Sequence, residues 1–325
     1  MYTLKMDKNG SVFQYLGLEF VRVTELAAIA ASKWVGRGDS KLADKAAVDS
    51  MRDTLNQIDF SGEIVIGEGA KDESFELYIG EKVGKGNGPV LDIAVDPLEC
   101  TSSVAYGRPN ALTTIAVGPK DTLYKAADSY MEKIAVGREA RNVIDLDAPA
   151  KDNIKKIAQS LGKDISEITV AVLDRERHQN LITEIREIGA RVQLFTDGDI
   201  AMAIATCLHE SPVDILMGVG GSAEGVLAAT ALKCLDGEIL CRWRPKDETH
   251  KNRLAEAGIT NFEKIFSAED LAKGNDLAFT ATGVLTGPLL PGVTSSIHGL
   301  TTHTVVMSSN PKTVRFIETH HRPSN

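Results

Sequence analysis

The stretch VLDIAV at residues 90–95 is followed directly by DPLECT at residues 96–101. The apolar run predicts a buried β-strand. Pro97 has a fixed φ and no backbone N–H, and it favours an extended conformation of the residue before it, so we expect the strand to end at Asp96. The chain then turns with the carboxylates of Asp96 and Glu99 close to the strand end, and the hydroxyl of Thr101 follows them.

A second strand end repeats this arrangement upstream. EIVI at residues 63–66 predicts a short strand, and Glu68 follows it between two glycines. Carboxylate oxygens at two strand ends suit Mg²⁺ or Mn²⁺, which keep open positions for a substrate phosphate. Taken alone, Asp-Pro after a strand also fits a plain turn, and Gly-Glu-Gly fits a solvated loop. Together with Thr101, the two strand ends predict a metal site.

The composition is that of an ordinary globular protein. The 325 residues are 43% hydrophobic and 25% charged, which is enough for one large core or two packed lobes. The net charge of −9 argues against a nucleic-acid or anionic-membrane partner. It leaves a phosphate substrate open, because bound divalent ions reverse the local charge.

Cysteine usage and hydropathy bear on the cellular compartment. The four cysteines are scattered and form no C-x-x-C pair, and residues 1–14 lack the apolar core of a signal peptide. The sequence also has no run of about 18 apolar residues that could span a membrane. We therefore expect a cytoplasmic protein in a reducing compartment.

Hydrophobic spacing predicts a first half in which helices pack on a mainly antiparallel sheet. Apolar residues recur at helical spacing over 18–32 and 41–57. Strands are expected at 63–66, 90–95, 112–117, 122–126 and 131–136.

From about residue 152, helices and strands alternate. The pattern predicts helices at 152–161, 178–188, 199–208 and 223–235, and strands at 168–173, 191–195 and 213–217. Such alternation indicates parallel βαβ units. Further strands near 276–281, 302–307 and 313–319 are expected to return to the sheets. We expect residues 1–148 to form a metal-site lobe and residues 149–325 a substrate-side α/β lobe, joined in one catalytic unit.

Three predicted strand ends in the second half carry charged residues. Arg175 and Arg177 follow the first and can grip a phosphate, although a solvated basic turn is an equally good interpretation. Asp197 and Asp199 follow the second, where an acid is often only an N-cap. A glycine-rich turn and Glu224 follow the third, at a predicted helix start that is suited to an anion. The economical arrangement is one cleft, with metals on one side and substrate phosphate held from the other.

Nearly the whole chain, from about Leu18 to Thr319, resembles the class II fructose-1,6-bisphosphatases, the GlpX-type enzymes of the lithium-sensitive sugar-phosphatase superfamily. The motifs that carry the resemblance are VRVTELAAIA with GRGD (21–39), VIGEG (65–69), DESFELYIGEKVG (72–84), DIAVDPLECT (92–101), DSYMEK (128–133), VIDLDAP (143–149), LDRERH (173–178), DGD (197–199) and MGVGGSAEGV (217–226). The resemblance implies an α/β fold of the inositol monophosphatase-like type, a layered α/β/α/β/α sandwich of two sheets.

The resemblance also implies roles for individual residues. It implies metal ligands at Asp44, Glu68, Asp96, Glu99 and Glu224, and substrate contacts from Tyr130, Arg175, Arg177, Asp197 and Asp199. Thr101 is implied to position the attacking water, and an acid such as Asp72 bridged to its hydroxyl would help. The implied reaction is hydrolysis of the 1-phosphate of fructose 1,6-bisphosphate, with Mn²⁺ or Mg²⁺ as cofactor. The implied assembly is a homo-oligomer, a dimer or a tetramer.

The sequence departs from the family pattern beside these residues. Cys100 stands where glycine is usual, Ala70 replaces a second acid and is followed by Lys71, and Ser40 stands where lysine is typical. These departures leave several alternatives open. They are activity on sedoheptulose 1,7-bisphosphate as well, an oxidation-sensitive enzyme, another substrate such as an inositol phosphate, and a non-catalytic sugar-phosphate-binding regulator on the same fold.

Overall fold

The computed structural model describes residues 13–69 and 76–322. The helices are α1 (Phe13–Ser32), α2 (Ser40–Leu55), α3 (Thr101–Tyr106), α4 (Ala150–Leu161), α5 (Gln179–Glu187), α6 (Asp199–Ala205), α7 (Ser222–Cys234), α8 (Glu248–Glu256) and α9 (Ala268–Leu271). The strands are β1 (Ser61–Ile66), β2 (Lys82–Val83), β3 (Val90–Glu99), β4 (Ala111–Pro119), β5 (Tyr130–Val136), β6 (Thr169–Leu173), β7 (Arg191–Phe195), β8 (Ile215–Gly221), β9 (Glu238–Trp243), β10 (Ile265–Phe266), β11 (Ala278–Leu285), β12 (Thr294–Ser296), β13 (Gly299–Ser309) and β14 (Lys312–His321).

The strands form two sheets. The first has the order β12-β13-β11-β4-β3-β1-β2, with β14 paired to β13, and only its β1–β3 pair is parallel among the pairs described. The second has the order β10-β9-β5-β8-β6-β7, in which β6 runs parallel to β7 and β8 while β5 is antiparallel to its neighbours. The mainly antiparallel first sheet and the parallel pairs in the second confirm the predicted α/β class.

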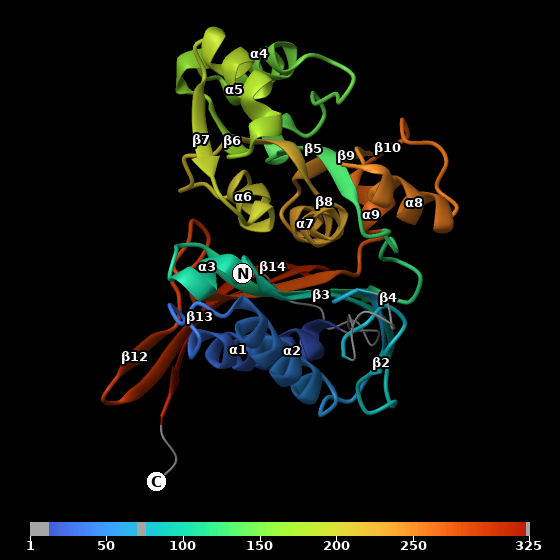
Figure 1. Cartoon of the computed structure of the whole chain (residues 1–325), viewed down its shortest axis with the longest axis vertical. Helices are drawn as coiled ribbons and strands as arrows, with labels where there is room; N and C mark the ends of the chain where they lie inside the picture. Colours follow the sequence, from blue (N-terminus) through green and yellow to red (C-terminus); the bar gives the residue numbers. More distant parts are fainter. Residues whose placement is uncertain (1–12, 70–75, 323–325) are drawn as a thin grey trace, which may run out of the picture.

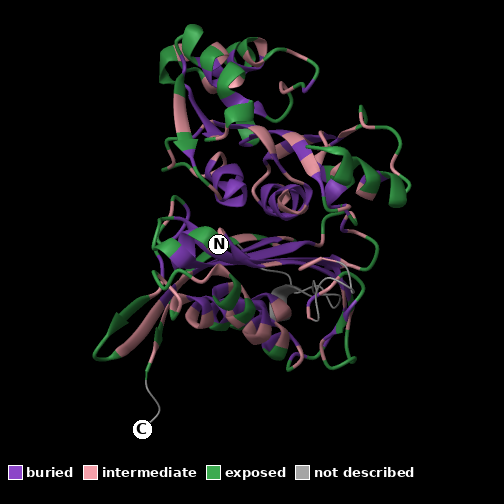
Figure 2. Ribbon diagram, in the orientation of Figure 1, coloured by how far each residue is buried: buried purple, intermediate pink, exposed green. Residues whose placement is uncertain are grey.

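The layers of the molecule alternate between helices and sheets. In Figure 1, α1 and α2 cover the outer face of the first sheet, α6 and α7 lie between the sheets, and α4 and α5 lie beyond the second sheet. The α/β/α/β/α sandwich is therefore confirmed. Because both sides of α7 are covered, its residues from Gly225 to Leu232 are all buried, as the purple helix in Figure 2 shows. Within the described part of the chain, no helix has the length and apolar character needed to cross a membrane.

Three expectations about local structure need correction. The strand predicted to end at Asp96 continues to Glu99, and the effect of Pro97 is an irregularity in the pairing with β4 between those two acids. Residues 122–126 form no strand, because the carboxylate of Asp92 accepts the backbone N–H groups of Thr122 and Leu123. The glycines at 218–221 belong to β8 and form no turn before α7.

The two sheets do not follow the predicted lobe boundary at residues 148 and 149. Strand β5 precedes this boundary but belongs to the second sheet. Strands β11 to β14 follow it but belong to the first sheet, where β11 pairs with β4. These last strands therefore return to the first sheet, as expected, and the boundary between residues 148 and 149 does not coincide with the division between the two sheets. Their return joins both halves into one body.

Candidate functional site

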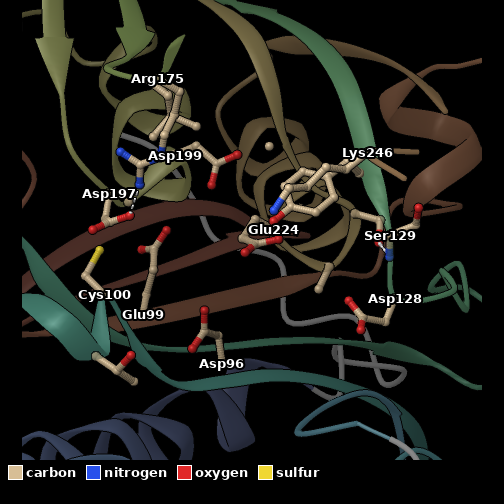
Figure 3. A pocket seen from close by; sticks show the side chains of 18 of the residues that line it. Asp96, Glu99, Cys100, Asp128, Ser129, Arg175, Asp197, Asp199, Glu224 and Lys246 are labelled. Carbon is tan, nitrogen blue, oxygen red and sulfur yellow. Dashed lines mark hydrogen bonds and ion pairs between the residues drawn. The ribbon is translucent and has the colours of Figure 1, made fainter. Parts of the chain in front are cut away.

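A cavity of about 730 Å³ lies between the ends of strands from both sheets. Figure 3 shows acidic side chains on its floor and wall, with Arg175 and Lys246 on opposite sides. Nine of the predicted site residues line this cavity: Asp96, Glu99, Thr101, Tyr130, Arg175, Arg177, Asp197, Asp199 and Glu224.

The other three predicted residues have different positions. Asp44 on α2 and Glu68 after β1 do not line the cavity, but their charges raise the pKa of Asp96. These two acids therefore belong to the same electrostatic cluster. Asp72, predicted to assist Thr101, lies outside the described residues.

Glu99 is the most buried acid of this cluster, with 5% of its surface exposed. Its Oε1 accepts the backbone N–H of Ile200 at 3.1 Å, whereas its buried Oε2 has no hydrogen-bond partner among the described residues. Burial, followed by the charges of Asp96 and Asp199, raises its pKa well above the usual range. A buried carboxylate oxygen without a partner needs a proton or a cation.

The pKa values of the neighbouring acids are raised in the same way. Burial followed by the charge of Glu224 raises the pKa of Asp96, and burial followed by Asp199 raises the pKa of Glu224. Burial followed by Asp44 raises the pKa of Glu68 to about 7. A divalent cation would remove this mutual repulsion, and carboxylate oxygens are the ligands that Mg²⁺ and Mn²⁺ prefer.

The side chains as they stand do not yet form a coordination sphere. Within residues 13–69 and 76–322, no group of three His, Cys, Asp or Glu side chains is arranged so that it could hold a metal ion. The acids thus fit a divalent ion in charge and ligand chemistry, and side-chain rotation would have to bring their oxygens together.

The glycines at the end of β8 leave room for two of the acids. A Cβ atom at Gly220 would collide with the carboxylate of Asp199, and one at Gly221 would collide with the carboxylate of Glu224. Asp199 also forms an ion pair with the buried Lys133, with 2.5 Å between Oδ2 and Nζ. The strand therefore presents its bare backbone to the acids at the start of α6 and α7.

The opposite wall of the cavity is basic. Arg175 follows β6 and donates to Asp197, which follows the adjacent strand β7, at 2.6 Å. Arg177 donates to the backbone carbonyl of Val219 at 2.6 Å, and its guanidinium carbon lies 5.5 Å from the centre of the Tyr130 ring. The predicted phosphate-binding arginines thus face the same cavity as the acids.

Several residues of the site were not predicted from the sequence. Lys133, Asp128 and Ser129 lie in or next to the motif DSYMEK, where the charged and hydroxyl side chains were visible but unassigned. Lys246 and His250 line the cavity from the segment after β9, a strand that was also not predicted. The short apolar run of Ile239, Leu240 and Cys241, followed by Trp243, is the sequence signal that could have identified this strand.

Cys100 has the left-handed backbone conformation, with φ 69° and ψ 47°. Glycine adopts a positive φ without strain, which gives a physical reason why it is usual in the family at this position. Burial, followed by the charges of Glu99 and Asp96, raises the pKa of the Cys100 thiol far above its ordinary value. Since the thiolate is the reactive form, a raised pKa slows the oxidation of this thiol in the metal-free protein.

Cys100 is expected to resist alkylation in the folded protein. Iodoacetamide at pH 8 should leave it unmodified over a period in which the denatured chain reacts fully, because burial and neighbouring acids suppress the thiolate. Peptide mass spectrometry after labelling measures this directly. Rapid and selective modification of folded Cys100 would contradict the expectation and support the oxidation hypothesis.

Comparisons with known proteins show the family of the chain. The family model described as bacterial fructose-1,6-bisphosphatase, glpX-encoded, matches residues 14–321. The chain is 44% identical over 318 residues to fructose-1,6-bisphosphatase 1 class 2 of Escherichia coli strain K12, which covers 94% of this chain and 95% of that protein. The class 2 protein of Shigella flexneri matches with the same identity and coverage.

Solved structures show a weaker similarity, and one example is an inositol monophosphatase. The inositol monophosphatase from Anabaena matches 59% of this chain and 70% of its own, at 12% identity and a TM-score of 0.31. The match of the family model over most of the chain, together with the two class 2 relatives, is sufficient to assign the family. The chain belongs to the family of glpX-encoded bacterial fructose-1,6-bisphosphatases.

Proposed function

We propose that this protein hydrolyses the 1-phosphate of fructose 1,6-bisphosphate to give fructose 6-phosphate and inorganic phosphate. The observation that carries the proposal is a single cavity with buried acids on one side and arginines on the other. A sugar with a phosphate at each end matches this division of charge. The relatives named as fructose-1,6-bisphosphatases support the choice of substrate.

The acids are proposed to hold Mn²⁺ or Mg²⁺. Asp96, Glu99 and Glu224 would hold ions inside the cavity, and Asp44 and Glu68 would complete the cluster from α2 and the end of β1. When bound, divalent ions would neutralise the phosphoryl oxygens, make the attacking water more acidic and stabilise the leaving alkoxide.

The residues of the chain itself would orient the two ends of the substrate. Thr101 begins α3 beside Glu99 and lines the cavity, where its hydroxyl would orient the attacking water. Arg175 and Arg177 would hold the phosphate that is not cleaved, and so fix the position of the sugar. Asp197 and Asp199 face the same space and would accept hydrogen bonds from sugar hydroxyl groups.

The proposal is tested by following the products formed from fructose 1,6-bisphosphate with Mn²⁺ or Mg²⁺. We expect one equivalent each of inorganic phosphate and fructose 6-phosphate, the latter identified by an isomerase-coupled assay. Formation of fructose 1-phosphate, or no turnover with either ion, would contradict it. Sedoheptulose 1,7-bisphosphate and inositol phosphates in the same assay test the alternative substrates. Binding without hydrolysis would instead support a regulatory protein.

Metal affinity is expected to depend on pH through Glu68. Its pKa of about 7, raised from 4.5, means that the folded protein without metal keeps this proton over a range in which the unfolded chain releases it. Stability of the metal-free protein should therefore fall as pH rises from 4.5 to 7. Metal binding must displace the proton, so Mn²⁺ should bind about tenfold more weakly at pH 6 than at pH 8. Calorimetric titration measures this, and equal affinities at both values would contradict it.

We also propose that the enzyme is a cytoplasmic homo-oligomer. Cys100, Cys207, Cys234 and Cys241 are all free thiols, which suits a reducing compartment. The ten residues of β14 form an edge of the first sheet and expose 59% of Phe316, an arrangement that favours association. Light scattering coupled to size-exclusion chromatography measures the oligomeric state, and a monomer at micromolar concentration would contradict the proposed oligomer.

A further inference from the structure

The positive charges around the cavity are not equally available to a substrate. Arg175 is paired with Asp197, so part of its charge is already neutralised. Among the residues that the structure describes, Arg177 donates only to the carbonyl of Val219, and Lys246 forms no ion pair. Arg177 and Lys246 therefore remain as cations without a carboxylate partner.

The sheet brings these two cations to the same aromatic ring. Strand β9 pairs with β5, and the ladder continues beyond the strand through a bond from Arg244 N to the carbonyl of Tyr130 at 2.9 Å. Two residues later, Lys246 Nζ lies 5.9 Å from the centre of the Tyr130 ring. Arg177 reaches that ring from the segment after β6. Two cations without a carboxylate partner at one ring make a place for a multiply charged anion.

A buried hydroxyl lies beside them. Ser129 precedes Tyr130, is 2% exposed and lines the cavity, and its Oγ has no hydrogen-bond partner in the described part of the chain. An unpartnered buried hydroxyl next to two free cations suits the oxygens of a phosphate or of the sugar that carries it. Asp96 and Glu99 lie in another part of the cavity, as Figure 3 shows, whereas Glu224 of the proposed metal cluster lies next to Gly221, the residue that pairs with Tyr130.

We propose that Lys246 binds the phosphate that is not cleaved, together with Arg177, and thereby selects bisphosphates over monophosphates. The inference rests on the proposed function, because it assigns one end of that substrate. It makes Lys246 a specificity residue, since its charge acts on a group remote from the reacting phosphate. A lysine on a flexible stem also tolerates some variation in the distance between the two phosphates.

The test compares the Lys246→Met variant with the unmodified protein on two ligands. For fructose 1,6-bisphosphate with Mn²⁺, we expect KM to rise about tenfold with kcat within twofold, and Lys246→Arg to restore most of the affinity. For fructose 1-phosphate, which lacks the distal phosphate, kcat/KM should be the same in both proteins. The matched control is Lys264→Met, which removes a lysine 4.5 Å from the Phe266 ring and outside this cavity.

A binding measurement separates this inference from the proposed function. Fructose 6-phosphate carries only the distal phosphate, so calorimetry should show about tenfold weaker binding to Lys246→Met even if the protein hydrolyses nothing. If the unmodified protein fails to hydrolyse the bisphosphate but this difference appears, the proposed function falls and Lys246 keeps its role. The role of Lys246 would be overturned if Lys246→Met and the unmodified protein bound fructose 6-phosphate equally well. It would also be overturned if the variant lost kcat/KM equally on fructose 1,6-bisphosphate and on fructose 1-phosphate.

Discussion

Replacing Glu99 with glutamine is expected to slow hydrolysis strongly and to stabilise the metal-free protein. Glutamine keeps the shape of the side chain and an oxygen for the Ile200 N–H, but it removes the charge of the buried, unpartnered Oε2. Loss of a metal ligand that supplies about 4 kcal/mol of transition-state stabilisation corresponds to about a 10³-fold fall in kcat/KM. Removing one of several repelling acids should raise the Tm of the metal-free protein by about 2–4 °C.

The opposite signs of the two effects make this test specific. A substitution that merely damages the fold lowers both Tm and activity. The removal of a repelling metal ligand instead raises the Tm and lowers the activity. Glu25→Gln is the matched control, because Glu25 is equally buried but accepts a hydrogen bond from Thr302 in the first sheet, away from the cavity. Activity of Glu99→Gln within tenfold of the unmodified protein would contradict the proposed metal cluster.

Replacing Lys133 with methionine is expected to lower the free energy of unfolding more than any other substitution proposed for this protein. Lys133 is buried in β5, and its ion pair with Asp199 joins this strand to the start of α6. Burial alone would lower its pKa, but the charges of Asp199 and Glu224 outweigh burial and raise it. Removing the lysine leaves a buried carboxylate beside other acids, which costs about 3–5 kcal/mol. Chemical denaturation measures this free energy of unfolding.

The double variant Lys133→Met, Asp199→Asn distinguishes an uncompensated charge from lost packing. Because it removes both charges, it should recover at least half of the stability lost in the single variant. The exposed pair of Lys251 and Glu248 provides the control, since Lys251→Met should change stability by less than about 1 kcal/mol. A single variant as stable as the unmodified protein would show that the buried pair contributes little.

The local part of the site could be predicted from the sequence because strand ends fix it. Asp96, Glu99 and Thr101 lie within six residues at the end of one strand, so their proximity follows from the chain itself. Arg175 and Asp197 are far apart in the sequence, yet they follow adjacent parallel strands in which Leu173 pairs with Phe195. Because the carboxyl ends of parallel strands meet at one edge, the alternating pattern brings them together.

The remainder depends on pairings that no local pattern specifies. Strand β11 pairs with β4 through partners such as Phe279 and Ala116, and hydrophobic periodicity does not indicate which distant strands will pair. Strand β9 was missed although four of its six residues, Ile239, Leu240, Cys241 and Trp243, are apolar. Lys246 was missed with it, because its approach to Tyr130 follows only from the pairing of β9 with β5.

The most direct test of the proposed site is a crystal structure with Mn²⁺ and fructose 6-phosphate, using the anomalous scattering of manganese to place the ions. The predicted result is an anomalous peak that contacts at least two of Asp96, Glu99 and Glu224, with the sugar phosphate between Arg177 and Lys246. Manganese bound away from these acids, or fructose 6-phosphate bound outside this cavity, would contradict the assignment of the site.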